Sequence, residues 1–309
     1  MAVKKIVITT GDPAGCGPLI TLDALNSLKD ANADFFVVGD ERILKRFPIY
    51  TRIKKRFCLI GANSPYVDKI KSGYPSRLCG QAALNYLRTG LKTLKKEKIK
   101  RLVTAPVSKE AIQKVVSGFS GHTEYLADYF GVKNFEMMMV SPELKVVLGT
   151  RHIPLRKVCA SIQTKNIIKT LNLVHSSLLK MFKIKNPKIA LVSINPHAGI
   201  NTHLEKEERI MLDTLKRVNA KIFGPFPADT IFIEQNLKKY DCLVCFYHDQ
   251  AMIPFKLLSI KEGVNLTLGL PIIRTSPAHG VAFDVMKAGK KPFSSSMVAA
   301  IRLALKLQV

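Results

Sequence analysis

The feature that most constrains the fold is an alternation of short apolar segments with longer helical patterns. The apolar segments have the length and β-branched composition of strands; they are KIVITT (5–10), DFFVVG (34–39), RLVTAP (101–106), FEMMMVS (135–141), KVVLGTRH (145–152), KIALVSINPH (188–197), DCLVCFYH (241–248) and NLTLGLP (265–271). Helical patterns at 80–96, 162–182 and 204–219 lie between several of them. Apolar strands that alternate with helices predict an α/β protein with largely parallel, doubly wound sheets.

The chain of 309 residues is long for one compact domain and sufficient for two. It contains no internal repeat and no Pro/Gly/Ser-rich linker. The apolar part of the N-terminal segment MAVKKIVITT is too short for a signal peptide, and no run is long enough to cross a bilayer. We therefore expect a cytoplasmic protein that does not act in a membrane.

The cysteines are expected to be reduced thiols, because they are scattered through a long chain without a secretion signal. Cys242 and Cys245 have CxxC spacing but lie inside an apolar strand-like run, where residues three apart point to opposite faces. We interpret them as buried structural cysteines rather than a redox or zinc pair.

Charge is the most unusual property of the composition, since 48 Lys and Arg against 23 Asp and Glu give a formal net charge of +25. Such a field attracts nucleic acids, anionic membranes or anionic metabolites. No zinc-finger, helix-turn-helix or RNA-binding aromatic pattern accompanies the charge, so we expect no nucleic-acid partner. A small phosphorylated substrate is equally consistent with it.

Histidines end or follow several of the predicted strands, where ligands of open α/β sheets bind. They are His152 in RHIPL, His197 in NPHAG and His248 in YHDQ. Neutral imidazoles suit a divalent transition metal and leave open positions for substrate oxygens. The histidines are 45 and 51 residues apart. These distances carry no ligand-spacing signal, and structural histidines are the alternative.

Two further loops could either contact a ligand or have a purely structural role. GDPAGCGP (11–18) follows the first strand and should open a helix, but it lacks the Rossmann glycine spacing and a P-loop lysine. It is either a tight turn or a ligand contact. In GHTEY (121–125), Thr123 is a candidate helix cap, while His122 could bind an anion at the helix N-terminus. Arg274, after an apolar run, suits a phosphate or carboxylate.

The chain resembles the 4-hydroxythreonine-4-phosphate dehydrogenase family of vitamin B6 synthesis from about residue 6 to its C-terminal helix. The motifs occur in the family's order: GDPAG, GHTEY, HIPL, NPHAG, GPFPADT, YHDQ, NLTLGLPIIRTS and HG. The resemblance implies the two-domain fold of isocitrate and isopropylmalate dehydrogenases and a homodimer with its active site at the subunit interface. We expect one α/β domain from 1–120 and 265–309, and a central α/β domain from 121–264 that contributes to dimerisation.

The resemblance also implies roles for individual residues. The divalent-metal ligands would be His152, His197 and His248, holding one zinc, magnesium or cobalt ion per site. The substrate contacts would be His122, Thr123, Lys256, Asn265 and Arg274. The nucleotide, NAD or alternatively NADP, would contact His279, Gly280 and Asp284. Lys256, Asp249 and Asp229 are the candidate catalytic residues: Lys256 would offset the charge of the substrate, and either aspartate would orient a ligand histidine or accept a proton.

The implied reaction is oxidation of 4-phosphooxy-L-threonine (4-hydroxythreonine 4-phosphate) to a 3-oxo acid, which loses carbon dioxide to give 3-amino-2-oxopropyl phosphate. One alternative is a dehydrogenase for a phosphorylated sugar acid, such as threonate or erythronate 4-phosphate, on the same scaffold. The other is a decayed, non-catalytic binder. The chain departs from the family pattern by the residues Leu19, Arg151, Ile200, Asn201, Thr202 and Ala278.

Overall fold

The structure is a computed structural model that describes residues 3–199, 205–259 and 261–309. In the part of the chain that it describes, backbone contacts define two compact units. Unit 1 spans Met1–Gly131 and Leu270–Leu307, and unit 2 spans Val132–Gly269. Both are α/β units, as the alternation of strand-like and helical segments predicts.

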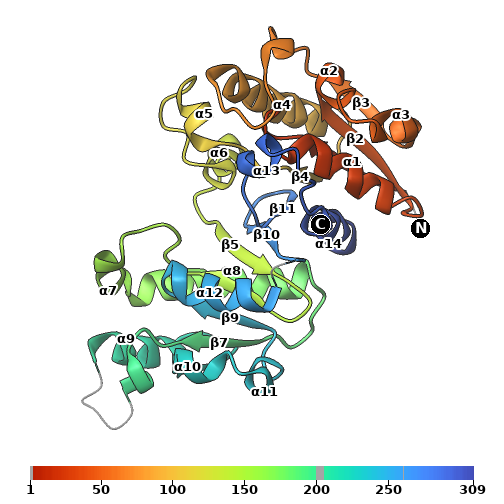
Figure 1. The fold of residues 1–309 in the computed structure, drawn as a ribbon. Helices are drawn as coiled ribbons and strands as arrows, with labels where there is room; N and C mark the ends of the chain where they lie inside the picture. The colour runs from red at the N-terminus through yellow and green to blue at the C-terminus, as the bar shows by residue number, and fades with distance from the viewer. Residues whose placement is uncertain (1–2, 200–204, 260) are drawn as a thin grey trace. The chain divides into compact units, whose positions relative to one another are not determined.

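Unit 1 is built on a parallel sheet with the strand order β3-β2-β1-β4-β11. Its strands are β1 (Lys4–Thr9), β2 (Ala33–Gly39), β3 (Cys58–Gly61), β4 (Arg101–Thr104) and β11 (Ile273–Pro277). Its helices are α1 (Gly17–Ser27), α2 (Glu41–Leu44), α3 (Ile49–Ile53), α4 (Arg77–Lys96), α5 (Lys109–Gln113), α6 (His122–Tyr129), α13 (Phe283–Lys287) and α14 (Ser295–Lys306). Short 3-10 turns occupy Lys54–Arg56 and Val67–Lys69. The helices lie on both faces of the sheet (Figure 1).

The core of unit 1 follows from the two-residue period of its strands. Val7 of β1 and Leu102 of β4 are buried in one apolar cluster with Leu84 and Leu87 of α4. Neighbouring strand residues such as Ile8 point to the opposite face, where α14 packs against β1, β4 and β11. Burial on both faces explains why these strands read as continuous apolar runs.

Unit 2 has a mixed sheet with the strand order β10-β5-β6-β9-β7-β8. Its strands are β5 (Glu136–Val140), β6 (Lys145–Leu148), β7 (Lys188–Val192), β8 (Lys221–Phe226), β9 (Cys242–Cys245) and β10 (Val264–Leu268). Its helices are α7 (Val158–Ser161), α8 (Thr164–Lys180), α9 (Lys206–Leu215), α10 (Ala228–Ile231), α11 (Glu234–Leu237) and α12 (His248–Ser259), and 3-10 turns occupy Leu155–Lys157 and Pro196–Gly199. Strands β6, β9, β7 and β8 are parallel, whereas β5 is antiparallel to both β6 and β10.

The unit boundaries fall after Gly131 and Gly269, somewhat later than the expected 120/121 and 264/265. Helix α6 belongs to unit 1 because Leu126 is part of its buried apolar cluster. Strand β10 belongs to unit 2 because it pairs along its length with β5. Packing partners far apart in sequence therefore set both boundaries.

Strands β3, β8 and β11 were not expected from the apolar pattern. β3 is only four residues long and lies at the edge of its sheet, with its side chains partly exposed. β8 has the sequence KIFGPF, whose Gly-Pro pair reads as a turn, and it is also an edge strand. Edge strands tolerate proline and exposure because one side of the strand needs no partner.

Burial rather than redox chemistry explains the CxxC pair, as expected. Cys242 and Cys245 are free, buried thiols on β9. Burial raises the pKa of Cys242 to about 12, and it also raises the pKa of Cys245. Both therefore remain protonated at neutral pH. In the described part of the chain, no helix combines the length and apolar character needed to cross a bilayer.

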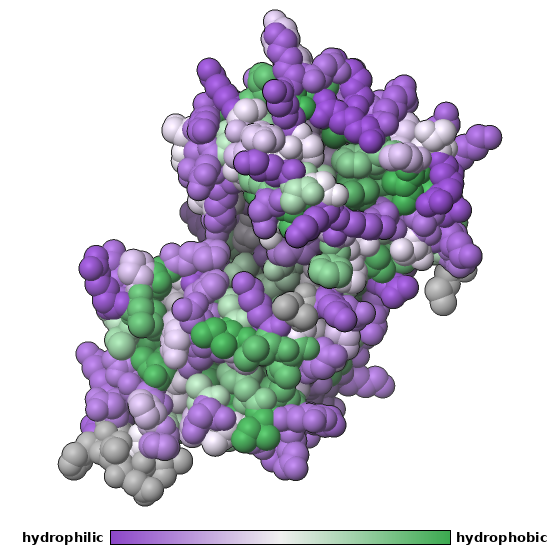
Figure 2. Space-filling view, viewed as in Figure 1, coloured by the Kyte–Doolittle hydropathy of each residue, from purple (hydrophilic) through white to green (hydrophobic). Residues whose placement is uncertain are grey.

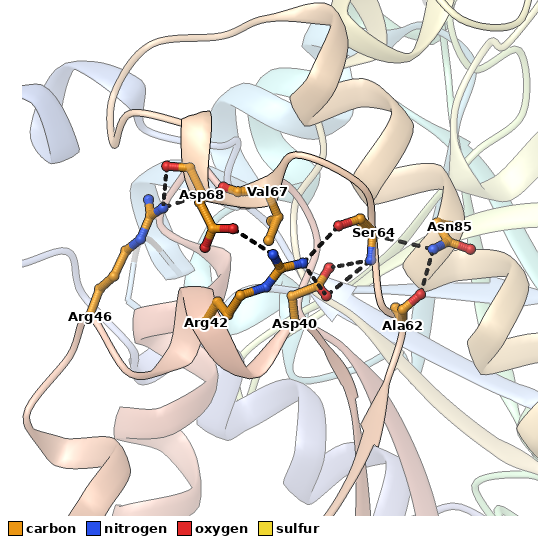
Figure 3. Close-up of polar contacts among 8 residues, drawn as sticks. All are labelled: Asp40, Arg42, Arg46, Ala62, Ser64, Val67, Asp68 and Asn85. Carbon is orange, nitrogen blue, oxygen red and sulfur yellow. Dashed lines mark hydrogen bonds and ion pairs between the residues drawn. The ribbon is translucent and has the colours of Figure 1, made fainter.

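A polar network closes the carboxyl end of β2 in unit 1 (Figure 3). The buried carboxylate of Asp40 accepts hydrogen bonds from the backbone N–H of Ser64, at 3.0 and 3.2 Å. Arg42 donates to the carbonyl of Ser64 at 2.9 Å, and Asn85 of α4 donates to the carbonyl of Ala62 at 2.8 Å. These side chains fix the loop after β3, so this strand end has a structural role.

Candidate active site

The three candidate metal ligands follow neighbouring parallel strands of unit 2. Strand β9 pairs in parallel with β6 on one side and β7 on the other. His152 follows β6, His248 follows β9 and His197 follows β7, each within five residues of the strand end. The carboxyl ends of parallel strands lie at the same edge of a sheet, so the fold brings three residues from distant parts of the sequence to one edge.

Two of these histidines face each other. The ring centroids of His152 and His248 are 5.6 Å apart. Nδ1 of His248 is 2.7 Å from Oδ1 of Asp249, which leaves Nε2 as the nitrogen available for a metal. A carboxylate on the far nitrogen is the usual second partner of a metal-bound imidazole. The donor chemistry of this pair therefore fits a divalent ion.

The third histidine is not part of that pair. His197 is exposed on the turn after β7, where it and Ala198 both have left-handed backbone, at φ 56° and 53°. Among the described residues, no group of three or more His, Cys, Asp or Glu side chains lies close enough together to hold a metal. The structure thus brings together His152 and His248, with His197 at the same sheet edge but apart from them.

Arg151, which precedes His152, is anchored away from the histidine pair. Its Nη1 donates to the carbonyl of Phe135 at 2.8 Å and lies 3.3 Å from Oε2 of Glu136, while its guanidinium covers the Phe135 ring at 4.4 Å. Glu136 is buried and accepts a 2.7 Å hydrogen bond from Thr170. Burial raises the pKa of Glu136, and the Arg151 charge partly opposes this. The departure at position 151 therefore adds a partly buried ion pair beside the loop of His152.

Unit 1 contains a buried cation at the centre of the second group of candidates. Arg274 on β11 is 2% exposed. Its Nε and Nη2 donate to the hydroxyl of Thr104, at 3.2 and 2.7 Å, and its Nη1 donates to the hydroxyl of Thr123 at 3.4 Å. Burial lowers the pKa of Arg274 to about 10, so it remains charged at neutral pH. A buried guanidinium held by hydroxyl groups is suited to an anionic ligand.

His122 lies beside this cation as a neutral imidazole. Burial lowers its pKa well below the usual value, and the charges of Arg274 and Lys109 lower it further. A neutral imidazole can both donate and accept a hydrogen bond. The sequence also predicts Thr123 as a helix cap, which is wrong: α6 begins at His122 after Gly121, which has φ 148°, with no side-chain cap. Its hydroxyl contacts Arg274 instead.

The remaining substrate and catalytic candidates lie in unit 2. Asn265 on β10 donates from Nδ2 to the sulfur of Met137 at 3.3 Å, and its buried Oδ1 has no hydrogen-bond partner among the described residues. Lys256 is exposed in the last turn of α12. Asp229 is exposed on α10, and no hydrogen bond or ion pair joins it to the histidines within the described chain. Of the catalytic candidates, Asp249 is hydrogen-bonded to one of the histidines, His248.

The candidate nucleotide segment rests on the GDPAG loop. Residues 11–17 are all buried. The N–H of Cys16 donates to the carbonyl of Val281 at 2.8 Å, and its thiol lies 3.6 Å from the carbonyl of Gly280. His279, Gly280 and Asp284 are exposed, and Asp284 is in the first turn of α13. The loop's observed contacts are therefore structural, since it supports the turn that carries these residues.

The other departures from the family pattern are at positions 19, 278 and 200–202. Leu19 is half-buried in the first turn of α1. The N–H of Ala278 donates to the hydroxyl of Ser296 on α14 at 3.0 Å. The backbone at position 278 is therefore held against α14. Ile200, Asn201 and Thr202 lie outside the described residues.

Two α/β units, with histidines after the parallel strands of one and a buried guanidinium and amide on strands β11 and β10, have the arrangement of polar groups found in ligand-binding α/β enzymes. The family model "Pyridoxal phosphate biosynthetic protein PdxA" matches residues 31–304. The chain is 35% identical to a 4-hydroxythreonine-4-phosphate dehydrogenase of Sulfurihydrogenibium sp., over 98% of each chain. It is 36% identical to an Oceanobacillus iheyensis protein provisionally named D-threonate 4-phosphate dehydrogenase, over 99% of each.

Solved structures are also similar to the chain. The 4-hydroxythreonine-4-phosphate dehydrogenase of Klebsiella pneumoniae superposes with a TM-score of 0.83 at 30% identity, covering 98% of both chains. Isocitrate dehydrogenase from Methylococcus capsulatus shares the fold at a TM-score of 0.53 and 14% identity, covering 98% of this chain and 85% of that one. The chain belongs to the PdxA family, and the predicted dehydrogenase fold is confirmed.

Proposed function

We propose that the protein is a 4-hydroxythreonine-4-phosphate dehydrogenase of pyridoxal phosphate synthesis. It would use NAD to oxidise 4-hydroxythreonine 4-phosphate to a 3-oxo acid that decarboxylates to 3-amino-2-oxopropyl phosphate. The observation that carries the proposal is the His152–His248 pair at the edge where three parallel strands end, in a chain of this family. NADP is the alternative nucleotide.

A bound divalent ion would polarise the hydroxyl and later the keto oxygen of the substrate, and NAD would accept the hydride. His152, His197 and His248 are the residues that would hold the ion. Asp249 keeps the His248 ring in place through Nδ1. Donor chemistry leaves zinc, cobalt and magnesium as candidates, although imidazole ligands suit zinc and cobalt best.

We assign the phosphate of the substrate to the cluster of Arg274, Thr123 and His122 in unit 1. Arg274 would supply charge-assisted hydrogen bonding, and Thr123 and the neutral His122 would add further contacts. Asn265 is proposed as an additional substrate contact, because its buried amide oxygen lacks a partner among the described residues. Lys256 is proposed as another, because it is an exposed cation on α12, the helix that begins at His248. Asp229 and Asp249 stay candidates for proton transfer. His279, Gly280 and Asp284 are proposed to contact the nucleotide.

The test is NADH formation by the purified protein with 4-hydroxythreonine 4-phosphate. We expect turnover that chelation abolishes and a divalent ion restores. Replacing His152, His197 and His248 together with alanine should abolish both turnover and metal binding. His175→Ala, a histidine on α8, is the control. Turnover that survives in the triple variant would refute the metal-dependent mechanism.

A sugar-acid phosphate is the second candidate substrate. The relative from Oceanobacillus iheyensis supports it, since its provisional name specifies D-threonate 4-phosphate. The two substrates differ at C2, where one carries an amino group and the other a hydroxyl group. Parallel measurement of kcat/KM with both compounds distinguishes them, and a higher value for D-threonate 4-phosphate would reverse the assignment.

We further propose that the protein is a homodimer with its active site at the subunit interface. Helix α12 supports this, because it exposes Ile253, Leu257 and Leu258 at 58%, 80% and 42%. Figure 2 shows apolar residues gathered over this part of unit 2. An exposed apolar patch on a helix is typical of an interaction surface. Leu257→Asp should shift the mass in solution from dimer to monomer, and an unchanged dimer would exclude this face.

A further inference from the structure

The turns that carry the candidate metal ligands are joined by a chain of hydrogen bonds. Gln250, 6% exposed on α12, bridges two of them. Its Oε1 accepts from the backbone N–H of Phe246 at 2.9 Å, and its Nε2 donates to the carbonyl of Ser193 at 2.6 Å. Phe246 follows β9 and Ser193 follows β7. One amide therefore links the strand end before His248 to the strand end before His197.

The contacts continue on both sides of Gln250. On the β6 side, the hydroxyl of Thr150 donates to the carbonyl of Phe246, and the N–H of Gly149 donates to the carbonyl of Cys245 at 2.7 Å. The chain thus reaches the backbone two residues before His152.

On the β7 side, the contacts reach a buried carboxylate. Glu208 of α9 is 0% exposed. Its Oε1 accepts from the hydroxyl of Ser193 at 2.6 Å and the N–H of Asn195 at 3.2 Å, and its Oε2 accepts from Nδ2 of Asn195 at 2.6 Å. Burying a carboxylate is costly unless several donors satisfy it. This carboxylate therefore holds the turn before His197 in one arrangement.

These contacts share a spacing. Each candidate ligand lies two residues beyond a position that the chain of hydrogen bonds fixes: His152 after Thr150, His197 after Asn195 and His248 after Phe246. Gln250 is the residue that connects the last two.

We propose that Gln250 is a positioning residue for the candidate metal ligands, with Thr150 and Glu208 completing its set of contacts. This inference rests on the proposed metal role of the histidines. Both ends of the Gln250 amide bind backbone groups, so Gln250 would act on the ligand-bearing turns and would not itself be a ligand. It fixes the distance between two ligand-bearing turns, and the partners behind metal ligands affect metal affinity strongly when they are lost.

The test uses Gln250→Glu, which keeps the size of the side chain and the acceptor for Phe246. It replaces the donor to Ser193 with an oxygen. Calorimetric titration with Co²⁺ should show affinity weakened about 10- to 100-fold. Hydrogen exchange of the metal-free protein should be faster in the segments 193–199 and 246–250.

The matched control is Asn85→Asp. Asn85 is also an amide that bridges loop positions, since it donates to Ala62 and Ser64, but it lies in unit 1 (Figure 3). This control should lower thermal stability and leave Co²⁺ affinity unchanged. Thr150→Val should weaken binding without changing Gln250, and Thr150→Ser should restore it. This pair still tests the inference if the Gln250 variant does not fold.

The inference is overturned if Gln250→Glu binds Co²⁺ as tightly as the wild type, or if Asn85→Asp loses the same affinity. A wild-type protein that binds no divalent ion refutes the proposed function instead. In that case the exchange rates of segments 193–199 and 246–250 still decide whether Gln250 holds the two turns together.

Discussion

Replacing Asp12 with asparagine should stabilise the protein by an amount that grows with pH. Asp12 is 0% exposed, and its Oδ1 accepts a 2.9 Å hydrogen bond from the N–H of Ala14. Its Oδ2 is buried without a partner among the described residues. Burial raises the pKa of Asp12 from 3.8 to about 6, against the effect of the Ala14 N–H. The charged form is therefore the costly one in the folded protein.

The magnitude follows from proton linkage. The folded state holds this proton more tightly than the unfolded chain, so stability falls as pH rises from about 3.8 to about 6 and levels off above that. A difference of about two pH units, at about 1.4 kcal/mol each, amounts to about 3 kcal/mol above pH 6. About 1.4 kcal/mol of this arises between pH 5 and pH 8.

Asp12→Asn removes the charge and keeps the acceptor for Ala14. Urea unfolding at pH 5 and pH 8 measures the difference in unfolding free energy between variant and wild type. We expect this difference to increase by about 1.4 kcal/mol in favour of the variant at the higher pH. Asp30→Asn, at an exposed carboxylate, is the control. A difference that does not change with pH, or that favours the variant more at pH 5, refutes the argument.

Other predictions concern the buried polar groups. Thr104→Val removes the hydroxyl that Arg274 contacts through two nitrogens; it should cost about 1–3 kcal/mol of unfolding free energy and raise KM for the phosphorylated substrate. His122 should stay neutral at neutral pH, so its C2 proton resonance should not shift between pH 6.5 and pH 8, because burial and the charges of Arg274 and Lys109 lower its pKa well below the usual value; a titration in that range would contradict this direction. Thr170→Val should destabilise unit 2 by about 1–3 kcal/mol in thermal or urea unfolding, because buried Glu136 loses its 2.7 Å donor, whereas Thr170→Ser should restore much of that loss.

The sequence was sufficient for the fold class because its buried strands are long, apolar and separated by helices. It also placed the histidines at strand ends, and the order β6-β9-β7 then made those ends neighbours. That order is not sequential, so the 5.6 Å approach of His152 to His248 could not be read from spacing. The edge strands β3 and β8 were not predicted. The residues of β3 are partly exposed, and β8 contains a Gly-Pro pair that is typical of a turn.

Side-chain contacts between elements far apart in the sequence could not be predicted from it either. Arg274 is hydrogen-bonded to Thr104 and Thr123, which are 170 and 151 residues away in the sequence. Neither threonine could therefore be predicted as its partner. Thr123 instead suggested a helix cap, the commoner role of a threonine after glycine and histidine at a helix start. Gln250 and Glu208 gave no signal, because a buried amide or carboxylate is recognised only by the groups it contacts.

The distribution of thiols makes the protein suited to spectroscopic measurement. Cys58 in unit 1 and Cys159 in unit 2 are exposed, whereas Cys16, Cys79, Cys242 and Cys245 are buried. Burial raises the pKa of each buried thiol, and reagents that attack thiolates will therefore react slowly with them. The unmodified chain thus accepts one fluorophore or spin label on each unit, so that distances between the units can be followed in solution as substrate, nucleotide or metal is added.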